Sequence, residues 1–354
     1  MGANAWAARP DMQSWYATLA ARAALWRPHT GLIVRRDSVI AEVVRAARSG
    51  ARWLVHPCLN TLTRDAPENR YERDVLFVAW VSAHATDPLG TMTLNRLSWG
   101  WSPDGEAVSL PAGCHDLAGL LERDRPPSSD YAPPHAAFAI AIDIHCRSTG
   151  FLLPRAWPEP VACDALPSLA ITASREIAHA LDVLTLRLPA CTNWVSAVTS
   201  VIVPLQHHGV ERSSGSLPDI PGMIHLAGLH GPVSALEAVI HESAHHHFTM
   251  TEAAGALVDP THQTLYPSPL RNEARPLARV LLAVHALWHM VRFYDDAIAS
   301  GLLSPEWSDR RSRLQRQLVT GLGTLTQATP HFTTGGRALL TSLRNGAPND
   351  AALP

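Results

Sequence analysis

Apolar residues recur at every third or fourth position along much of the chain, which is the spacing of one face of a helix. In residues 11–26, for example, Trp15, Leu19, Ala23 and Trp26 fall on one such face. The stretches with this pattern, which we expect to be helical, are 11–26, 38–50, 69–86, 172–188, 234–250, 276–301, 305–326 and 333–345.

Polar residues and glycine mark the ends of several of these helices. Ser38, Ser174 and Ser234 stand where a helix begins, a position at which a hydroxyl accepts a hydrogen bond from a free backbone N–H. Ser234 and Glu237 also have the spacing of a capping box. Gly50 is placed to end the second helix, because glycine readily adopts the left-handed conformation found there.

The pattern changes to short apolar runs in the middle of the chain. A turn signal, Ser-Pro-Asp-Gly, separates two such runs in 98–110, which predicts a β-hairpin. The other expected strands are 136–144, 201–205 and 222–227, and the proline in 201–205 favours an edge position for that strand. The expected loops are 125–134, 211–221 and 255–270.

These elements predict a mainly α protein with a small β component, an α+β fold. A proline-rich stretch, 153–167, is the expected domain boundary. It divides the chain into a mixed, mostly helical region, 1–165, and a helical region, 166–354, which carries the candidate chemistry described below.

Composition narrows the classes of function. The 354 residues are 46% hydrophobic and 17% charged, and the net charge of -2 argues against a nucleic-acid or anionic-membrane surface. No apolar run is long enough to span a membrane, and the N-terminus lacks the apolar core of a signal peptide. The five cysteines form no C-x-x-C pair, so we expect reduced thiols in a cytoplasmic protein.

One short motif carries most of the chemical information. His241-Glu242-Ser243-Ala244-His245 is an H-E-x-x-H sequence, and residues four apart lie on the same face of a helix. Two imidazoles on one face suit a divalent metal ion, with Glu242 close enough to act on a water or to hydrogen-bond nearby. The alternative interpretation is that the run from His245 to His247 is a polar surface segment.

A third metal ligand should follow the motif in the sequence, because two histidines rarely complete a site. His285 and His289 lie four apart in the long helix, and Arg292 follows on the same face. The candidates for the third ligand are His285, His289, Glu273 and Glu252. A histidine of the long helix that is not a ligand is expected to be an ordinary core residue.

Residues 172–294 resemble the α-ketoglutarate-dependent HExxH-type peptide β-hydroxylases, also called HEXXH motif-containing peptide modification proteins, which tailor ribosomally made peptides. The resemblance covers about a third of the chain and depends on the order of several segments. These segments are a Ser-rich loop followed by Pro-Gly-Met-Ile-His-Leu at 221–226, Ala-Leu-Glu at 235–237, Ile-His-Glu-x-x-His at 240–245, Tyr-x-x-x-x-Arg at 266–271, Arg-Pro-Leu at 275–277 and His-Ala-x-Trp at 285–288, with Arg292 one turn later.

The resemblance implies a zincin-like metal helix in the helical C-terminal half and Fe(II) held by His241, His245 and His285. A three-histidine set departs from the two-histidine, one-carboxylate triad of most Fe(II) oxygenases. The cosubstrate would be α-ketoglutarate (2-oxoglutarate), whose distal carboxylate needs a bidentate cation. Arg275 is the first candidate for that cation, followed by Arg292 and Arg271.

The resemblance further implies hydroxylation of the β-carbon of a residue in a precursor peptide, with Glu242 supporting a ligand through a hydrogen bond. Two other interpretations remain. A zinc peptidase would hold Zn²⁺ on the same histidines, with Glu242 as general base. A non-catalytic peptide-binding protein would keep only the site's shape. In each case the expected partner is a peptide, and 1–165 and 211–221 are the expected docking surface.

Overall fold

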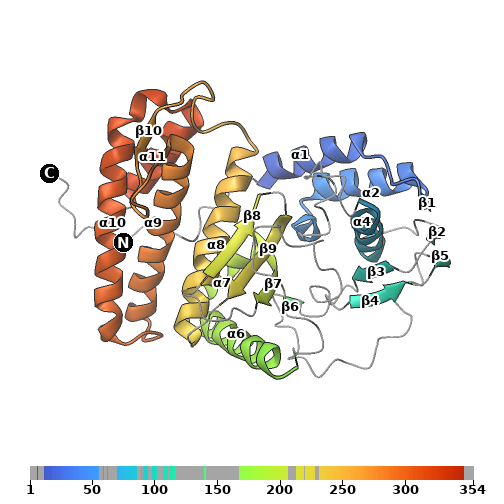
Figure 1. Cartoon of the computed structure of the whole chain (residues 1–354), viewed down its shortest axis with the longest axis horizontal. Helices are drawn as coiled ribbons and strands as arrows, with labels where there is room; N and C mark the ends of the chain where they lie inside the picture. Colours follow the sequence, from blue (N-terminus) through green and yellow to red (C-terminus); the bar gives the residue numbers. More distant parts are fainter. Residues whose placement is uncertain are drawn as a thin grey trace. The chain divides into compact units, whose positions relative to one another are not determined.

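The computed structural model describes most of the chain, and Figure 1 labels its helices and strands. The described residues are 6, 12–55, 59, 62, 70–85, 89, 91–94, 98–101, 107–110, 112–116, 139–140, 167–205, 213–218, 220–227 and 231–346. The chain groups into two compact units. We call residues 1–14, 181–195 and 236–354 the helical unit, and residues 15–180 and 196–235 the sheet unit.

The described strands of the sheet unit form small sheets. One is antiparallel, in the order β1-β2-β5, and β3 pairs with β4 as a hairpin. Another has the order β6-β7-β9-β8, in which only β8 runs antiparallel to its neighbour. The bounds are β1 Leu32–Val34, β2 Thr91–Leu94, β3 Ser98–Trp101, β4 Ala107–Leu110, β5 Gly113–Asp116, β6 Ala139–Ile140, β7 Thr199–Leu205, β8 Ser213–Leu217 and β9 Ile220–Ala227.

The sheet unit also contains most of α1, all of α2 and α4, and most of α6. The predicted apolar face of α1 is confirmed, because Trp15, Leu19 and Ala23 are all buried. Trp26 follows α1, packs edge-on against Phe77 and donates a hydrogen bond from its indole N–H to Asp74. The bounds are α1 Met12–Leu25, α2 Arg36–Ser49, η2 Arg52–Leu54, α4 Arg70–His84 and α6 Pro167–Arg187.

The helical unit consists of long helices and one short hairpin, β10-β11 (Figure 1). Helix α9 packs against α10 and against both strands of the hairpin. The largest side chains of its interior, Trp194, Phe293 and Tyr294, are almost completely inaccessible to solvent. The bounds are α7 Pro189–Ser196, α8 Pro232–Glu252, β10 Leu265–Pro267, β11 Ala274–Pro276, α9 Leu277–Ala299, η5 Pro305–Trp307, α10 Ser308–Gln327, η6 Thr329–His331 and α11 Thr334–Asn345.

The prediction of a mainly α protein with a small β component is confirmed, and so is the hairpin within 98–110. Gly50 ends α2 in the left-handed conformation, as predicted. The division near 153–167 and the loop 125–134 lie outside the described residues and stay predictions. Of the helices in the described part of the chain, none combines the length and apolarity needed to cross a membrane.

The predicted starts of the helices are wrong at Ser38 and Ser174. Helix α2 begins at Arg36, with Arg35 as N-cap and no side-chain capping bond, and α6 begins at Pro167. A proline is well suited to the first helical position, because it lacks the N–H that would otherwise need a partner. At α6 the backbone preference of this proline therefore outweighs the hydroxyl signal of Ser174.

Two predictions about the sheet are also wrong. Residues 213–217 form β8, because their backbone pairs with β9, whereas a loop was expected over 211–221. Strand β7 is interior rather than at an edge. Among the described residues β6 pairs only with Val201 and Ile202, so Pro204 lies beyond β6 and its missing N–H costs no bond to that strand.

Candidate metal centre

Helix α8 carries the H-E-x-x-H motif and begins two residues earlier than its hydroxyl signal indicates. Its first residue is Pro232, preceded by Gly231 in a left-handed turn conformation. The predicted capping box is therefore wrong: Ser234 lies within the first turn, and among the described residues its buried hydroxyl has no hydrogen-bond partner. Glu237 instead accepts hydrogen bonds from Tyr294 and Arg310, so it joins α8 to α9 and α10.

The predicted apolar stripe of α8 is confirmed by burial. Its members are Leu236, Val239, Ile240, Ala244 and Phe248, all at most 3% exposed. Burying one such large side chain stabilises the fold by about 1.5–3 kcal/mol. The stripe fixes the rotation of the helix, and this rotation decides where the histidines of the motif point.

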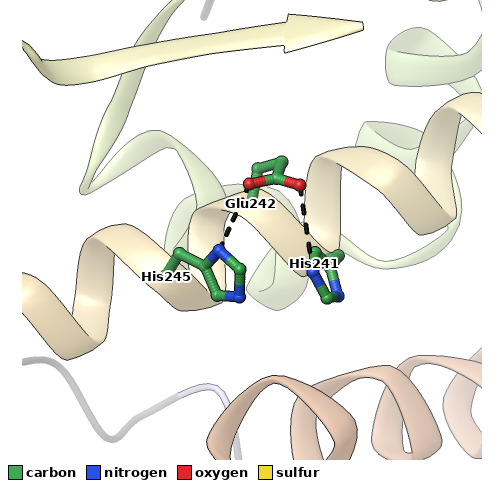
Figure 2. A group of neighbouring side chains, drawn as sticks. All are labelled: His241, Glu242 and His245. Carbon is green, nitrogen blue, oxygen red and sulfur yellow. Dashed lines mark ion pairs between the residues drawn. The ribbon is translucent and has the colours of Figure 1, made fainter. Parts of the chain in front are cut away.

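His241, Glu242 and His245 come together as a group whose possible ligand atoms all lie within 4.8 Å of one another. Figure 2 shows the carboxylate of Glu242 between the two imidazole rings. One carboxylate oxygen lies 3.3 Å from Nδ1 of His245, and the other lies 3.8 Å from Nε2 of His241. This group can hold a metal ion.

The three side chains of this group differ in their access to solvent. The two imidazoles are about a quarter exposed, whereas Glu242 is 2% exposed. A buried carboxylate is stable only when charged or hydrogen-bonding groups surround it, and here it lies against both rings. Glu242 is therefore placed to orient the imidazoles.

Helix α9 lies beside α8, and one of its residues, Met290, contacts the imidazole ring of His241. The sulfur of Met290 is 3.2 Å from Nδ1 of His241, on the opposite side of the ring from the nitrogen that faces Glu242. Met290 is 5% exposed, so this contact is shielded from water. Met290 was not a candidate from the sequence, because buried methionines commonly fill gaps and carry no motif of their own.

His285, on α9, is close enough to His245 to be affected by its charge. The ring of His285 packs against Phe248. Burial, followed by the charge of His245, lowers the pKa of His285 to about 3, against a smaller opposing effect of a hydrogen bond with the backbone of Ala244. His285 is therefore neutral at physiological pH, which is the form that binds metals.

His285 does not belong to the compact group formed by His241, Glu242 and His245. Its assignment as third ligand stays a prediction. The two carboxylate alternatives do not join the group either: Glu273 is exposed before β11, and Glu252 is the exposed last residue of α8. Of the four candidates, His285 combines burial, neutrality and proximity to the motif.

His289 lies in different surroundings. It is 4% exposed and packs against the rings of Trp194, Trp288 and Trp6. Burial is the largest of the effects that hold its pKa well below the usual range. These contacts are those of a core histidine, as expected for whichever residue of the pair is not a ligand.

The run that follows the motif is also buried. His246 and His247 are each 2% exposed, so the alternative of a polar surface run is wrong. His247 stacks on Trp194, and its Nε2 atom lies 2.9 Å from the backbone carbonyl oxygen of Trp194. α8 therefore contributes histidines to two separate environments.

The three candidate arginines differ in their partners. Arg292 forms an ion pair with Asp296, whose carboxylate also accepts a hydrogen bond from Trp6. Arg271 is exposed in the segment before β11. Arg275 lies in β11 opposite Tyr266, is half-buried, and forms no ion pair within the described residues. It thus keeps its guanidinium available, whereas that of Arg292 is engaged.

The chain was also compared with known proteins. No protein-family model matches it, and no curated protein matches it.

Proposed function

We propose that the protein is an Fe(II)- and α-ketoglutarate-dependent oxygenase that hydroxylates the β-carbon of a residue in a ribosomally made precursor peptide. The observation that carries the proposal is the convergence of His241, Glu242 and His245 on one helix. The order of the flanking segments, which resembles the HExxH-type peptide β-hydroxylases, supports it.

The residues present fit a divalent metal ion. His241 and His245 offer two imidazoles on one helix face, and His285 adds a buried, neutral imidazole. Bound Fe(II), together with O₂ and α-ketoglutarate, would supply the oxidation of a C–H bond. The role of the chain is to hold this ion with neutral nitrogen ligands and keep coordination positions open.

The remaining polar residues of the proposed site have separate tasks. Glu242 orients the imidazoles, because its buried carboxylate contacts both rings. Arg275 binds the distal carboxylate of the cosubstrate through its planar guanidinium. It is preferred over Arg292, which already pairs with Asp296. Peptide docking is assigned to 1–165 and to the segment 211–221, whose residues 213–217 form the strand β8.

A zinc peptidase is the second candidate, because the same histidines suit Zn²⁺ and Glu242 is adjacent to both. The burial of Glu242 argues against it: a general base must reach a water beside the substrate, and this carboxylate is 2% exposed. A non-catalytic peptide-binding protein is the third candidate and would need no metal.

The reaction class is tested by incubating the purified protein with the precursor peptide encoded beside its gene and measuring the intact mass. A hydroxylase adds one oxygen atom, releases succinate and stops when α-ketoglutarate is omitted. A His241→Ala variant is the matched control and should leave the mass unchanged. Two shorter fragments formed without O₂ and α-ketoglutarate would identify a zinc peptidase instead.

A further inference from the structure

The thioether of Met290 gives the site a sulfur atom that could bind a metal, in addition to its imidazole nitrogens. Its sulfur lies 3.2 Å from Nδ1 of His241, and the residue is 5% exposed. Nε2 of the same ring faces Glu242, so the two nitrogens of His241 face a carboxylate and a thioether. An imidazole nitrogen with a buried sulfur beside it offers a pair of donors to a soft ion.

The separation of the two atoms suits two ligands of one metal ion. With metal–nitrogen and metal–sulfur bonds of about 2.0 and 2.3 Å, two ligands of one ion lie about 3.0 Å apart at a bond angle of about 90° and about 3.5 Å apart at a tetrahedral angle. The observed 3.2 Å falls within that range. Thioether sulfur is a soft ligand that favours Cu(I), whereas imidazole suits copper, iron and zinc alike.

Two possible third donors therefore approach the motif from α9. His285 lies near His245 and offers a nitrogen, and Met290 lies against His241 and offers a sulfur. We propose that the site also binds Cu(I), through His241, His245 and Met290, in competition with the divalent ion that His241, His245 and His285 would hold. This inference rests on the proposed metal site, because both ions share the two histidines of the motif. Bound Cu(I) would exclude Fe(II) and so inhibit the hydroxylase.

The test compares metal affinities in the purified, metal-free protein under anaerobic, reducing conditions. Cu(I) is offered in competition with bicinchoninate, and Zn²⁺ is titrated separately. The thiols are first alkylated with iodoacetamide, because Cys114 is exposed and thiols also bind Cu(I). Met290→Leu removes the sulfur while nearly conserving volume. Met250→Leu, at another buried methionine, on α8, is the matched control.

We expect Met290→Leu to weaken Cu(I) binding by about tenfold or more and to leave Zn²⁺ affinity unchanged. Tenfold is the smallest usual effect of changing a residue that only supports a metal ligand, and a ligand itself should matter at least as much. Met250→Leu should bind both ions as the unchanged protein does. X-ray absorption at the copper edge should detect a sulfur neighbour that disappears in Met290→Leu.

Three results would overturn the inference. Equal Cu(I) affinity in Met290→Leu and the unchanged protein would make Met290 a packing residue that accepts a weak hydrogen bond from His241. An equal loss of Cu(I) and Zn²⁺ would assign it a structural role. Cu(I) binding that persists in His241→Ala would place copper elsewhere. The proposed function fails separately, if His241→Ala and His245→Ala bind Fe(II) and Zn²⁺ as tightly as the unchanged protein.

Discussion

Helix α8 carries two pairs of histidines that follow each other along the helix and differ in their exposure to solvent. His241 and His245 are partly exposed and lie against a carboxylate. His246 and His247 are buried, and His247 stacks on Trp194. Helix α9 repeats the contrast, with His285 beside the motif and His289 among tryptophans.

The difference shows that helical phase, rather than histidine content, separates candidate ligands from core residues. One residue along a helix rotates the side chain by about 100°, so His245 and His246 cannot face the same environment. The apolar stripe that fixes the phase is therefore as informative about the site as the motif itself. The two groups of histidines should therefore differ in function as they do in surroundings.

The largest effect is expected at the motif. His241→Ala and His245→Ala should each abolish metal binding, because the remaining imidazole cannot hold a divalent ion alone. Metal content measured by mass spectrometry after anaerobic purification checks this. His247→Ala is the control from the other group and should retain metal; retention in His241→Ala as well would remove the distinction between the groups.

The buried group should instead control stability. Trp194→Ala removes a ring that packs on His247, His289 and Trp6, and large aromatic deletions cost about 3–5 kcal/mol. Urea unfolding of the metal-free protein measures the change. If the folded variant also lost its metal affinity, the tryptophan cluster and the motif would form one functional unit.

Within α9, the pair His285 and His289 gives the sharpest contrast. His285→Ala should weaken metal binding by about 100-fold, whereas His289→Ala should retain the metal. Changing a residue that only hydrogen-bonds a metal ligand already costs about 10–100-fold in affinity, and losing a ligand should cost no less. Isothermal titration with Zn²⁺ provides the affinities. Full affinity in His285→Ala together with a loss in Glu273→Ala would transfer the third ligand to the carboxylate.

The arginines extend the comparison to the cosubstrate. Arg275→Ala should weaken α-ketoglutarate binding to the Fe(II) protein by about 1.5–3 kcal/mol, the usual contribution of a hydrogen bond to a charged group. Arg271→Ala is the exposed control and should have little effect. A loss in Arg292→Ala and none in Arg275→Ala, measured by titration of the absorption of the anaerobic complex, would reassign the role to Arg292.

The smallest effect is a pH dependence of stability in the metal-free protein. Folding lowers the pKa of His285 from its usual 6.5 to about 3, so the unfolded chain binds the proton more readily. The stabilising contribution is complete above pH 6.5 and is lost as the pH falls towards 3. At pH 5 the loss from His285 alone is about 2 kcal/mol. Urea unfolding at pH 7 and 5 should show a smaller loss in His285→Leu; an equal loss would mean that His285 takes up its proton without cost.

Much of the helical framework could be predicted because it depends on local patterns. The stripe of α8, the face of α1 and the glycine end of α2 follow from neighbouring residues alone. The starts of α2, α6 and α8 could not: α6 and α8 begin at a proline that precedes the serine, and α2 begins at Arg36 without a side-chain cap. Strand β8 was missed for another reason: its polar Ser-Ser-Gly-Ser sequence becomes a strand through pairing with β9.

The candidate site divides in the same way. His241, Glu242 and His245 are close because they share one turn of helix, which spacing predicts. Met290 approaches His241 because α9 packs beside α8, and no spacing within the sequence encodes that contact. The burial of His246 is likewise not encoded in the spacing of the motif.

The hydrogen bonds that Glu237 accepts from Tyr294 and Arg310 bear on how a metal ion would enter the proposed site. Glu237 lies one turn before His241, and its carboxylate joins the metal helix to α9 and α10 through protein groups alone. These helices are therefore already ordered when the protein has folded, so metal binding would not have to supply the free energy of ordering them. If the proposed site binds a metal, a preorganised site of this kind would exchange its ion without unfolding, and the ion bound would follow the supply of free metals in the surroundings.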